Sequence, residues 1–112
     1  MKILSRPEEL ILIAVLHLKD DAYGVTIRNH IIRRTGVEWT IGAIYVPLNR
    51  LAKAGYLETS IGDPTPERGG KRKKFYSLTP RGAKALAFAK RINDSMWNGL
   101  SVFERKALEG AD

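Results

Sequence analysis

The sequence predicts a mainly α-helical protein with one two-stranded β-hairpin. Three observations lead to this fold class. From residue 22 to residue 55, apolar residues recur every three to four positions, which is the spacing of one face of a helix. In the apolar run before them, periodicity does not separate helix from strand, but a capping box and a length of about a dozen residues favour helix. The spacing changes to two over residues 56–61 and 73–78, as is typical of strands. Helical spacing then returns after Pro80 and continues to about residue 98.

The first helix is expected to begin after Ser5, in a capping box formed by Ser5 and Glu8. Pro7 lies in the first turn, where the missing N–H of proline costs nothing. Residues 10–16 are apolar on nearly every side of this helix. Such a helix has to be covered all round, either by its own domain or by a second subunit.

A second helix is predicted over residues 22–35, with Asp20 and Asp21 as its caps. Gly24, near its start, would let another backbone approach closely. Cations stabilise the C-terminal end of any helix, so basic residues here are consistent with that role and equally with phosphate binding. Three arginines are open to both interpretations: Arg28, Arg33 and Arg34.

The third helix, residues 40–54, is expected to begin with Thr40 as its N-cap and to end before Gly55. One face is an apolar stripe with helical spacing: Ile44, Leu48 and Leu51. The opposite face is small or carries hydrogen-bonding groups: Gly42, Val46, Asn49 and Lys53, with Arg50 at its edge. A face that lies against base edges can have this composition. An ordinary solvent-exposed helix is the alternative.

Pro47 lies inside this predicted helix and removes one backbone hydrogen bond, to the carbonyl of Ala43. We expect a bend or a locally irregular turn there, but not a break, because the apolar stripe continues beyond it. Trp39, just before the helix, is expected to fill the space at the base of this helix, next to its first turn. Only the four residues 36–39 separate the second and third helices, so the pair resembles a helix-turn-helix.

The two strands, residues 56–61 and 73–78, are expected to pair as a hairpin. The segment between them, residues 62–70, is dense in Gly and Pro, which form turns. Its Gly69-Gly70 pair is therefore explained as turn chemistry. Five of the seven residues from 68 to 74 are cations: Arg68, Lys71, Arg72, Lys73 and Lys74.

The last helix is expected to have Thr79 as its N-cap and Pro80 at its first position. Little else in the chain is left for it to pack against except the first helix and a second copy of itself. The tail, residues 101–112, is predicted to be either a further short helical turn or a frayed end. The apolar side of the last helix consists of Ala83, Leu86, Ala89, Ile92, Met96 and Trp97.

Composition narrows the class of protein. The chain has 112 residues, 44% of them hydrophobic, which is enough for one domain with a core. Its 19 Lys and Arg against 12 Asp and Glu give a net charge of +7. This charge favours a polyanionic partner, with nucleic acid first and an anionic membrane surface second. No signal peptide is evident, and the apolar run over residues 10–18 is too short to span a bilayer, so we expect a cytoplasmic protein.

Chemistry-bearing motifs are missing from the sequence. It contains no Cys, which excludes disulfides, thiolate zinc sites and cysteine nucleophiles. It also lacks a GxSxG motif, a paired-carboxylate pattern and a phosphate-binding glycine loop before a helix. His17 and His30 have no partner pattern for metal binding or catalysis. We therefore expect no enzyme activity, no metal site and no cofactor.

The order of the elements indicates a winged helix-turn-helix with an additional C-terminal helix. The third helix would enter the major groove of double-stranded DNA, and the basic hairpin, or wing, would contact its backbone over residues 62–74. We expect a DNA-binding domain over residues 1–79 and a dimerisation helix and tail over residues 80–112, in one folded unit. An adaptor that docks an acidic protein on the hairpin is the alternative. The expected DNA contacts are Tyr23, Thr40, Gly42, Tyr45, Asn49, Arg50, Arg68, Lys71, Arg72, Lys73 and Lys74.

A set of short motifs in fixed order carries a resemblance to a known family. These motifs are Tyr23-Gly24, Gly42-Ala43-Ile44-Tyr45, Leu48-Asn49-Arg50-Leu51, Gly55-Tyr56-Leu57, Arg68 to Tyr76, Leu78-Thr79, Gly82 and Met96-Trp97-Asn98-Gly99-Leu100. In them the sequence resembles the PadR family of bacterial transcriptional regulators, in its short-chain branch, over about residues 8–100. The chain departs from the family pattern at Thr26, where an acid is common, and at Pro47, since the family's usual proline directly follows the tyrosine.

The resemblance implies a homodimeric repressor, in which the C-terminal helix packs against the partner's N-terminal helix. In such a dimer the two reading helices would lie about 34 Å apart, one turn of DNA. Some members of the family sense aromatic small molecules in a cavity at the dimer interface. Trp97 is placed either to line such a cavity for a small-molecule effector or to anchor the interface as a large apolar side chain.

Overall fold

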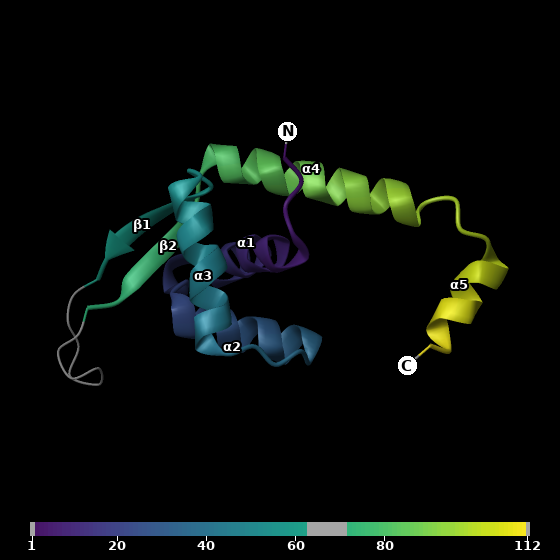
Figure 1. Cartoon of the computed structure of the whole chain (residues 1–112), viewed down its shortest axis with the longest axis horizontal. Coiled ribbons are helices and arrows are strands. Elements are labelled where there is room, and N and C mark those ends of the chain that lie inside the picture. Colours follow the sequence, from purple (N-terminus) through teal and green to yellow (C-terminus); the bar gives the residue numbers. More distant parts are fainter. Residues whose placement is uncertain (1, 63–71, 112) are drawn as a thin grey trace.

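Residues 2–62 and 72–111 are described in this computed structural model, and they form five α-helices and one antiparallel hairpin. The predicted fold class is confirmed. Helices α1 to α3 gather beside the hairpin, while α4 runs past them and carries α5 beyond its far end (Figure 1). The elements are α1 (Arg6–Leu18), a 3₁₀ turn (Lys19–Asp21), α2 (Gly24–Thr35), α3 (Ile41–Lys53), β1 (Leu57–Ile61), β2 (Lys74–Leu78), α4 (Pro80–Trp97) and α5 (Val102–Glu109).

Helix α1 begins at the predicted capping box. The Glu8 N–H donates to Ser5 Oγ over 3.3 Å, and the Ser5 N–H donates to Glu8 Oε1 over 2.8 Å. Most apolar side chains of α1 are buried in the core, but Leu16 remains 49% exposed. One chain therefore does not cover this helix on every side.

Helix α2 begins two residues later than predicted, and the expectation that Asp20 and Asp21 cap it is wrong. Both belong to the 3₁₀ turn that follows α1. The N-cap is Tyr23, whose backbone N–H donates to Thr26 Oγ1 over 3.0 Å. A threonine thus accepts the bond that an acid at this position would accept. The helix ends at Gly36, which has the left-handed backbone that glycine adopts readily (φ +73°).

Helix α3 has the predicted start and end. Thr40 Oγ1 accepts from the Ala43 N–H over 3.1 Å, and Gly55 has φ +82° just beyond the last turn. The helix is continuous through Pro47, whose ring is buried and widens the apolar face. That face is fully buried at Ile44, Leu48 and Leu51, as predicted. Trp39 packs against the core at the base of the helix.

The hairpin pairs Leu57 with Leu78 and Ile61 with Lys74, within one residue of the predicted strands. The segment before α2 adds to its edge, because the Tyr76 N–H donates to the Ala22 carbonyl over 2.8 Å. The segment predicted as the turn, with Arg68 and Lys71, lies outside the described residues.

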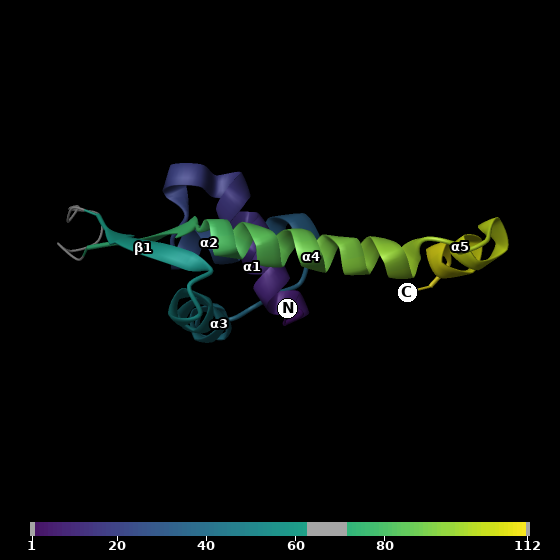
Figure 2. The same cartoon turned by 90° about the horizontal axis from the view of Figure 1, so that it is seen from above.

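Helix α4 begins with Thr79 as its N-cap, as predicted, but its buried face matches the predicted apolar side only in part. Gly82, Ala85 and Ala89 are the buried positions, because close approach to α1 and to the Tyr56 carbonyl needs small residues. Asn93 Nδ2 donates to Glu9 Oε1 of α1 over 2.7 Å, and the C-terminal end of α4 extends past α1 (Figures 1 and 2). The large apolar side chains at this end stay in solvent: Met96 is 76% and Trp97 is 61% exposed.

The C-terminal tail contains a short helix rather than a frayed end. Helix α5 begins with a capping box, in which Ser101 Oγ accepts from the Glu104 N–H over 3.1 Å. Every residue of α5 is exposed, including Phe103. No membrane-spanning helix is found among the described residues, because none combines sufficient length with sufficient hydropathy.

Candidate nucleic-acid interface

An open groove of about 660 Å³ lies between the outer face of α3 and the hairpin. The third helix and the wing therefore face a common space, which is the arrangement expected for an element that enters DNA beside one that follows its backbone. The groove, called here the α3–hairpin groove, is lined by Val46, Asn49, Arg50, Ala52, Lys53, Thr59 and Lys74.

The α3–hairpin groove is cationic. Arg50, Lys53 and Lys74 lie along it, and no carboxylate is among the described residues that line it. Asn49 lies on the exposed side of α3, one turn before Lys53. An asparagine amide can pair with adenine in the major groove, while cations contact phosphates without regard to sequence. The groove thus brings together the residue types that specificity and affinity each require.

The N-terminus of α3 is open to solvent. Thr40 uses its hydroxyl as the N-cap, so its side chain is already engaged with the backbone. Gly42 is exposed, and a Cβ added there would meet no atom within 4 Å. The space in front of Gly42 can therefore admit a DNA backbone, and the first-turn N–H groups of a helix attract phosphate.

Arg50 is bound to α1 rather than held out in solvent. Its Nε donates to Glu8 Oε2 over 3.2 Å, and the arginine side chain stays about half exposed. Burial raises the pKa of the Glu8 carboxyl, but hydrogen bonds from Ser5 and from Arg50, together with the arginine charge, lower the pKa overall. Arg50 thereby ties the C-terminal half of α3 to the start of α1.

Tyr45 and Gly24 are in direct contact. A Cβ built on Gly24 would lie 2.5 Å from the Tyr45 hydroxyl, so any larger residue at position 24 would have to displace this ring. The close approach expected at Gly24 is therefore made by a side chain and not by a backbone. Tyr45 is absent from the lining of the α3–hairpin groove.

Tyr23 and Lys73 form a stack at the base of the wing. The Tyr23 ring meets the Phe75 ring edge-on at 5.5 Å between centroids, and Lys73 Nζ lies 4.6 Å from the Tyr23 centroid. Arg72 and Lys74, the neighbours of Lys73 in the chain, are exposed. The structure thus places Lys73 at the start of α2, while Lys74 lines the α3–hairpin groove.

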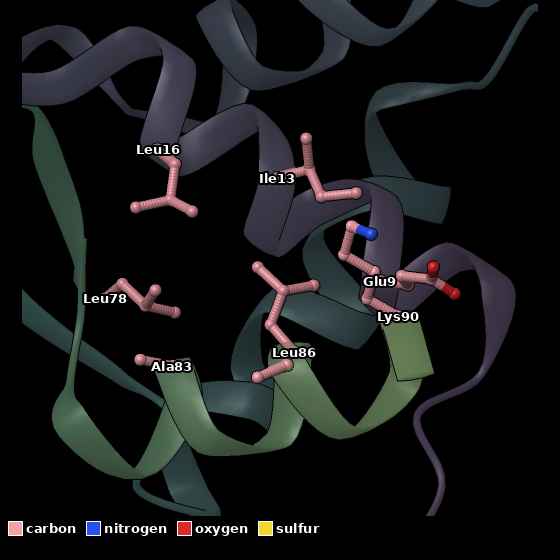
Figure 3. A pocket seen from close by; sticks show the side chains of 8 residues that line it. Glu9, Ile13, Leu16, Leu78, Ala83, Leu86 and Lys90 are labelled. Atoms are coloured by element: carbon pink, nitrogen blue, oxygen red, sulfur yellow. The ribbon is translucent and has the colours of Figure 1, made fainter. Parts of the chain in front are cut away.

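A second, apolar hollow of about 490 Å³ lies between α1 and α4 (Figure 3). Leu16 and Ile13 of α1 face Leu78 and Leu86 across it, with Glu9 and Lys90 at one end. Trp97 does not line this α1–α4 hollow. The signal that could have located it was the all-round apolar character of residues 10–16.

His17 and His30, which have no partner pattern in the sequence, are partners of each other. The nearest ring nitrogens are 2.8 Å apart, between α1 and α2. Burial, the nearby His17 and the charges of Arg34 and Arg33 lower the pKa of His30. No group of three or more potential metal ligands occurs in the described parts of the chain.

A three-helix bundle that carries a hairpin beside its third helix defines the winged helix-turn-helix class of DNA-binding domains. Residues 12–88 match the model of the transcriptional regulator PadR-like family. The chain therefore belongs to the PadR-like family of transcriptional regulators. No curated protein sequence matches it.

Several solved structures share the fold. A PadR-like transcriptional regulator from Bacillus cereus is 20% identical with a TM-score of 0.67, over 94% of this chain and 92% of that one. A PadR family regulator from Clostridium difficile is 23% identical with a TM-score of 0.60, over 81% and 94%. RosR of H. salinarum is 23% identical with a TM-score of 0.65, over 95% and 87%.

Proposed function

We propose that this protein is a sequence-specific DNA-binding repressor that acts as a homodimer. The observation that carries the proposal is the α3–hairpin groove, in which an exposed Asn49 is flanked by cations from α3 and from β2. Membership of a family of transcriptional regulators supports it. The net charge of +7 supports a nucleic acid as the partner.

In this proposal α3, residues 40–54, enters the major groove. Asn49 reads a base edge there, and the N-terminal turn around Gly42 approaches a phosphate. Lys53, Arg72 and Lys74 contact the DNA backbone and supply affinity that depends on salt but not on sequence. Arg50 and Lys73 have intramolecular partners, Glu8 and Tyr23, so they contribute to DNA binding only with the charge that these partners leave exposed.

Two complementary apolar features support the proposed dimer. The α1–α4 hollow is open, and the C-terminal end of α4 presents Met96 and Trp97 to solvent. In a two-fold symmetric dimer, the α4 of each copy covers the α1 of the other. The same apolar contact then forms at two symmetric places. Residues 80–112 then act as the dimerisation part, and residues 1–79 as the DNA-binding part.

Trp97 has two roles open within this dimer, as an apolar anchor or as part of a cavity for an aromatic effector. The chain has 2 tryptophans, so a Trp39→Phe variant leaves Trp97 as the single tryptophan reporter. Saturable quenching of its fluorescence by a planar aromatic compound supports the cavity. A blue-shifted emission that such compounds leave unchanged supports the anchor.

Selection of bound DNA from a random pool tests the proposed function. The expected result is one enriched sequence with two related half-sites about one helical turn, roughly 10 base pairs, apart. Binding should also weaken steeply with salt, with log K falling against log salt at a slope near −5 if about six phosphates are neutralised. If micromolar protein shifts no DNA at low salt, DNA binding is wrong, and an adaptor that docks an acidic protein on the hairpin is favoured.

A further inference from the structure

Three elements converge at the start of α2. A Cβ on Gly24 would lie 2.5 Å from the Tyr45 hydroxyl and 2.6 Å from the adjoining ring carbon, so the outer end of this α3 side chain lies directly on α2. Gly24 is buried, and Tyr45 is 39% exposed. The hydroxyl end of Tyr45 is therefore turned toward its own protein, although the residue lies on the helix proposed to read DNA.

The second strand of the wing joins α2 at the same place. The Tyr76 N–H donates to the Ala22 carbonyl over 2.8 Å, and Tyr23 forms a bridge with Phe75. The ring contact between Tyr23 and Phe75 strengthens this link. Residues 22–24 thus contact both the wing strand β2 and helix α3.

The Tyr76 hydroxyl completes this junction. It is buried, and it has no hydrogen-bond partner among the described residues. Burial, together with the neighbouring Tyr45, raises the pKa of Tyr76. Packing of its ring on Gly24 therefore holds Tyr45 against α2, and residues 22–23 link this end of α2 to β2. We call Gly24, Tyr45 and Tyr76 the tyrosine junction.

We propose that Tyr45 is a positioning residue for DNA reading, whose ring, seated on Gly24, fixes α3 against α2 and the wing strand β2. This inference rests on the proposed function, in which α3 reads the major groove. Asn49 lies one turn after Tyr45 and does line the α3–hairpin groove. A shift of α3 on α2 moves Asn49 relative to the wing cations, and base contacts tolerate only small displacements.

The ring and the hydroxyl of Tyr45 can be separated by two substitutions. Tyr45→Phe keeps the ring and should bind the selected DNA within about twofold of wild type. Tyr45→Ala removes the ring and should weaken binding to the selected DNA by about tenfold, an effect comparable to one mismatched base pair. Binding to random DNA at low salt should change little, because it depends on phosphate contacts.

The ratio of selected to random affinity is the decisive readout, because a loss of stability alone would not change it while the protein stays folded. If Tyr45→Phe loses as much selectivity as Tyr45→Ala, the hydroxyl contacts DNA and the positioning role is wrong. The role is equally contradicted if Tyr45→Ala keeps the wild-type ratio.

Gly24→Ala tests the contact from the other side. The added methyl group displaces the Tyr45 ring, so this change should lower selectivity in the wild-type background but have little further effect in Tyr45→Ala. Such non-additivity is expected of two residues that act through one contact. If the two losses add independently, Tyr45 does not act through Gly24. Should Gly24→Ala fail to fold, the two Tyr45 variants still decide the proposal.

Amide chemical shifts measured without DNA distinguish a failure of the positioning role of Tyr45 from a failure of the proposed DNA-binding function. Gly24→Ala should move the amide resonances of α3 and β2, but should move them much less in Tyr45→Ala. If these shifts occur while the wild-type protein enriches no DNA, the contact stands and the proposed function fails. If DNA binds selectively and α3 resonances do not move, the proposed function stands and the positioning role fails.

Discussion

Two surfaces of this protein, the α3–hairpin groove and the α1–α4 hollow, differ in the kinds of side chain that they expose. The α3–hairpin groove exposes an asparagine and several cations, while the α1–α4 hollow exposes leucine, isoleucine and alanine side chains. A cationic groove gains from a polyanion and loses affinity with salt. An apolar hollow gains from removing its surface from water. The difference teaches that one small domain can carry two surfaces of opposite chemistry, which the proposed function assigns to DNA and to a second copy of the chain.

The largest expected effect comes from placing a charge in the apolar hollow. Leu16→Glu should abolish the dimer, because burying an unpaired carboxylate costs several kcal/mol. Leu16 is half exposed in one chain, so the fold itself should tolerate the change. Sedimentation should give the monomer mass, and binding to a two-half-site DNA should fall by about a hundredfold or more, since one reading helix is lost.

Val37→Glu is the matched control for this change. Val37 is an exposed apolar residue between α2 and α3, away from the α1–α4 hollow. The Val37→Glu variant should therefore remain a dimer. A dimer that survives Leu16→Glu would show that the α1–α4 hollow is not the interface.

The next effect concerns the cations around the α3–hairpin groove. Replacing Lys53, Arg72 and Lys74 by Ala should weaken binding to selected and random DNA alike, by about tenfold or more. The slope of log K against log salt should flatten by about 2.7 if each cation neutralises one phosphate. Filter-binding titrations over a salt series measure both quantities.

An equal loss of charge elsewhere provides the control. Lys84, Arg105 and Lys106 are exposed on α4 and α5, outside the groove. Replacing these three by Ala removes the same charge but should leave the salt slope almost unchanged. Equal effects of the two triple variants would mean that only net charge matters, and that the groove has no special role.

A smaller effect is expected at Asn49. Asn49→Ala should reduce the preference for the selected sequence by about 1–3 kcal/mol at one base position and leave binding to random DNA nearly unchanged. Repeating the selection with the variant should show relaxed preference at that position alone. An unchanged selected sequence would remove Asn49 from base reading.

The smallest effect is a pH dependence of stability at the pair of histidines. Burial, His17 and the charges of Arg34 and Arg33 lower the pKa of His30, so the unfolded chain binds more protons than the folded one between the lowered value and the ordinary value near 6.5. Stability from this group is therefore complete above pH 6.5 and declines as pH falls toward the lowered pKa.

His30→Gln keeps a hydrogen-bonding side chain but removes the titration. Its melting temperature should fall less than that of wild type between pH 7.5 and 5.5, by a few degrees at most. This window lies above the ordinary pKa of carboxylates, so Glu8 does not contribute to the difference. If the melting temperatures of wild type and His30→Gln change equally with pH over this range, protonation of the histidine pair is not coupled to folding.

The capped ends of the helices were predictable from sequence because their bonds are local. Ser5, Thr40 and Thr79 each accept from an N–H three residues away, so a short stretch of sequence contains both partners. The start of α2 was not predictable in this way. It is set by Tyr23 and Ala22 joining β2, more than fifty residues later in the chain.

The candidate site was predictable in composition but not in geometry. The basic wing and the small, polar face of α3 were evident in the sequence, whereas the pairing of Arg50 with Glu8 joins residues 42 positions apart. The seat of Tyr45 on Gly24 and the bond between His17 and His30 likewise depend on how helices pack. Sequence periodicity identifies which face of a helix is buried, but not which partner a residue meets at the edge of that face.

Amide chemical-shift mapping during titration with the selected DNA tests the division of the surface most directly. The account predicts that the largest shifts occur around the α3–hairpin groove, at Gly42, Val46, Asn49, Lys53, Thr59 and Lys74, while Ile13, Leu16 and Leu86 in the α1–α4 hollow change little. Shifts concentrated along α1 and α4, with α3 and the hairpin unaffected, would contradict it.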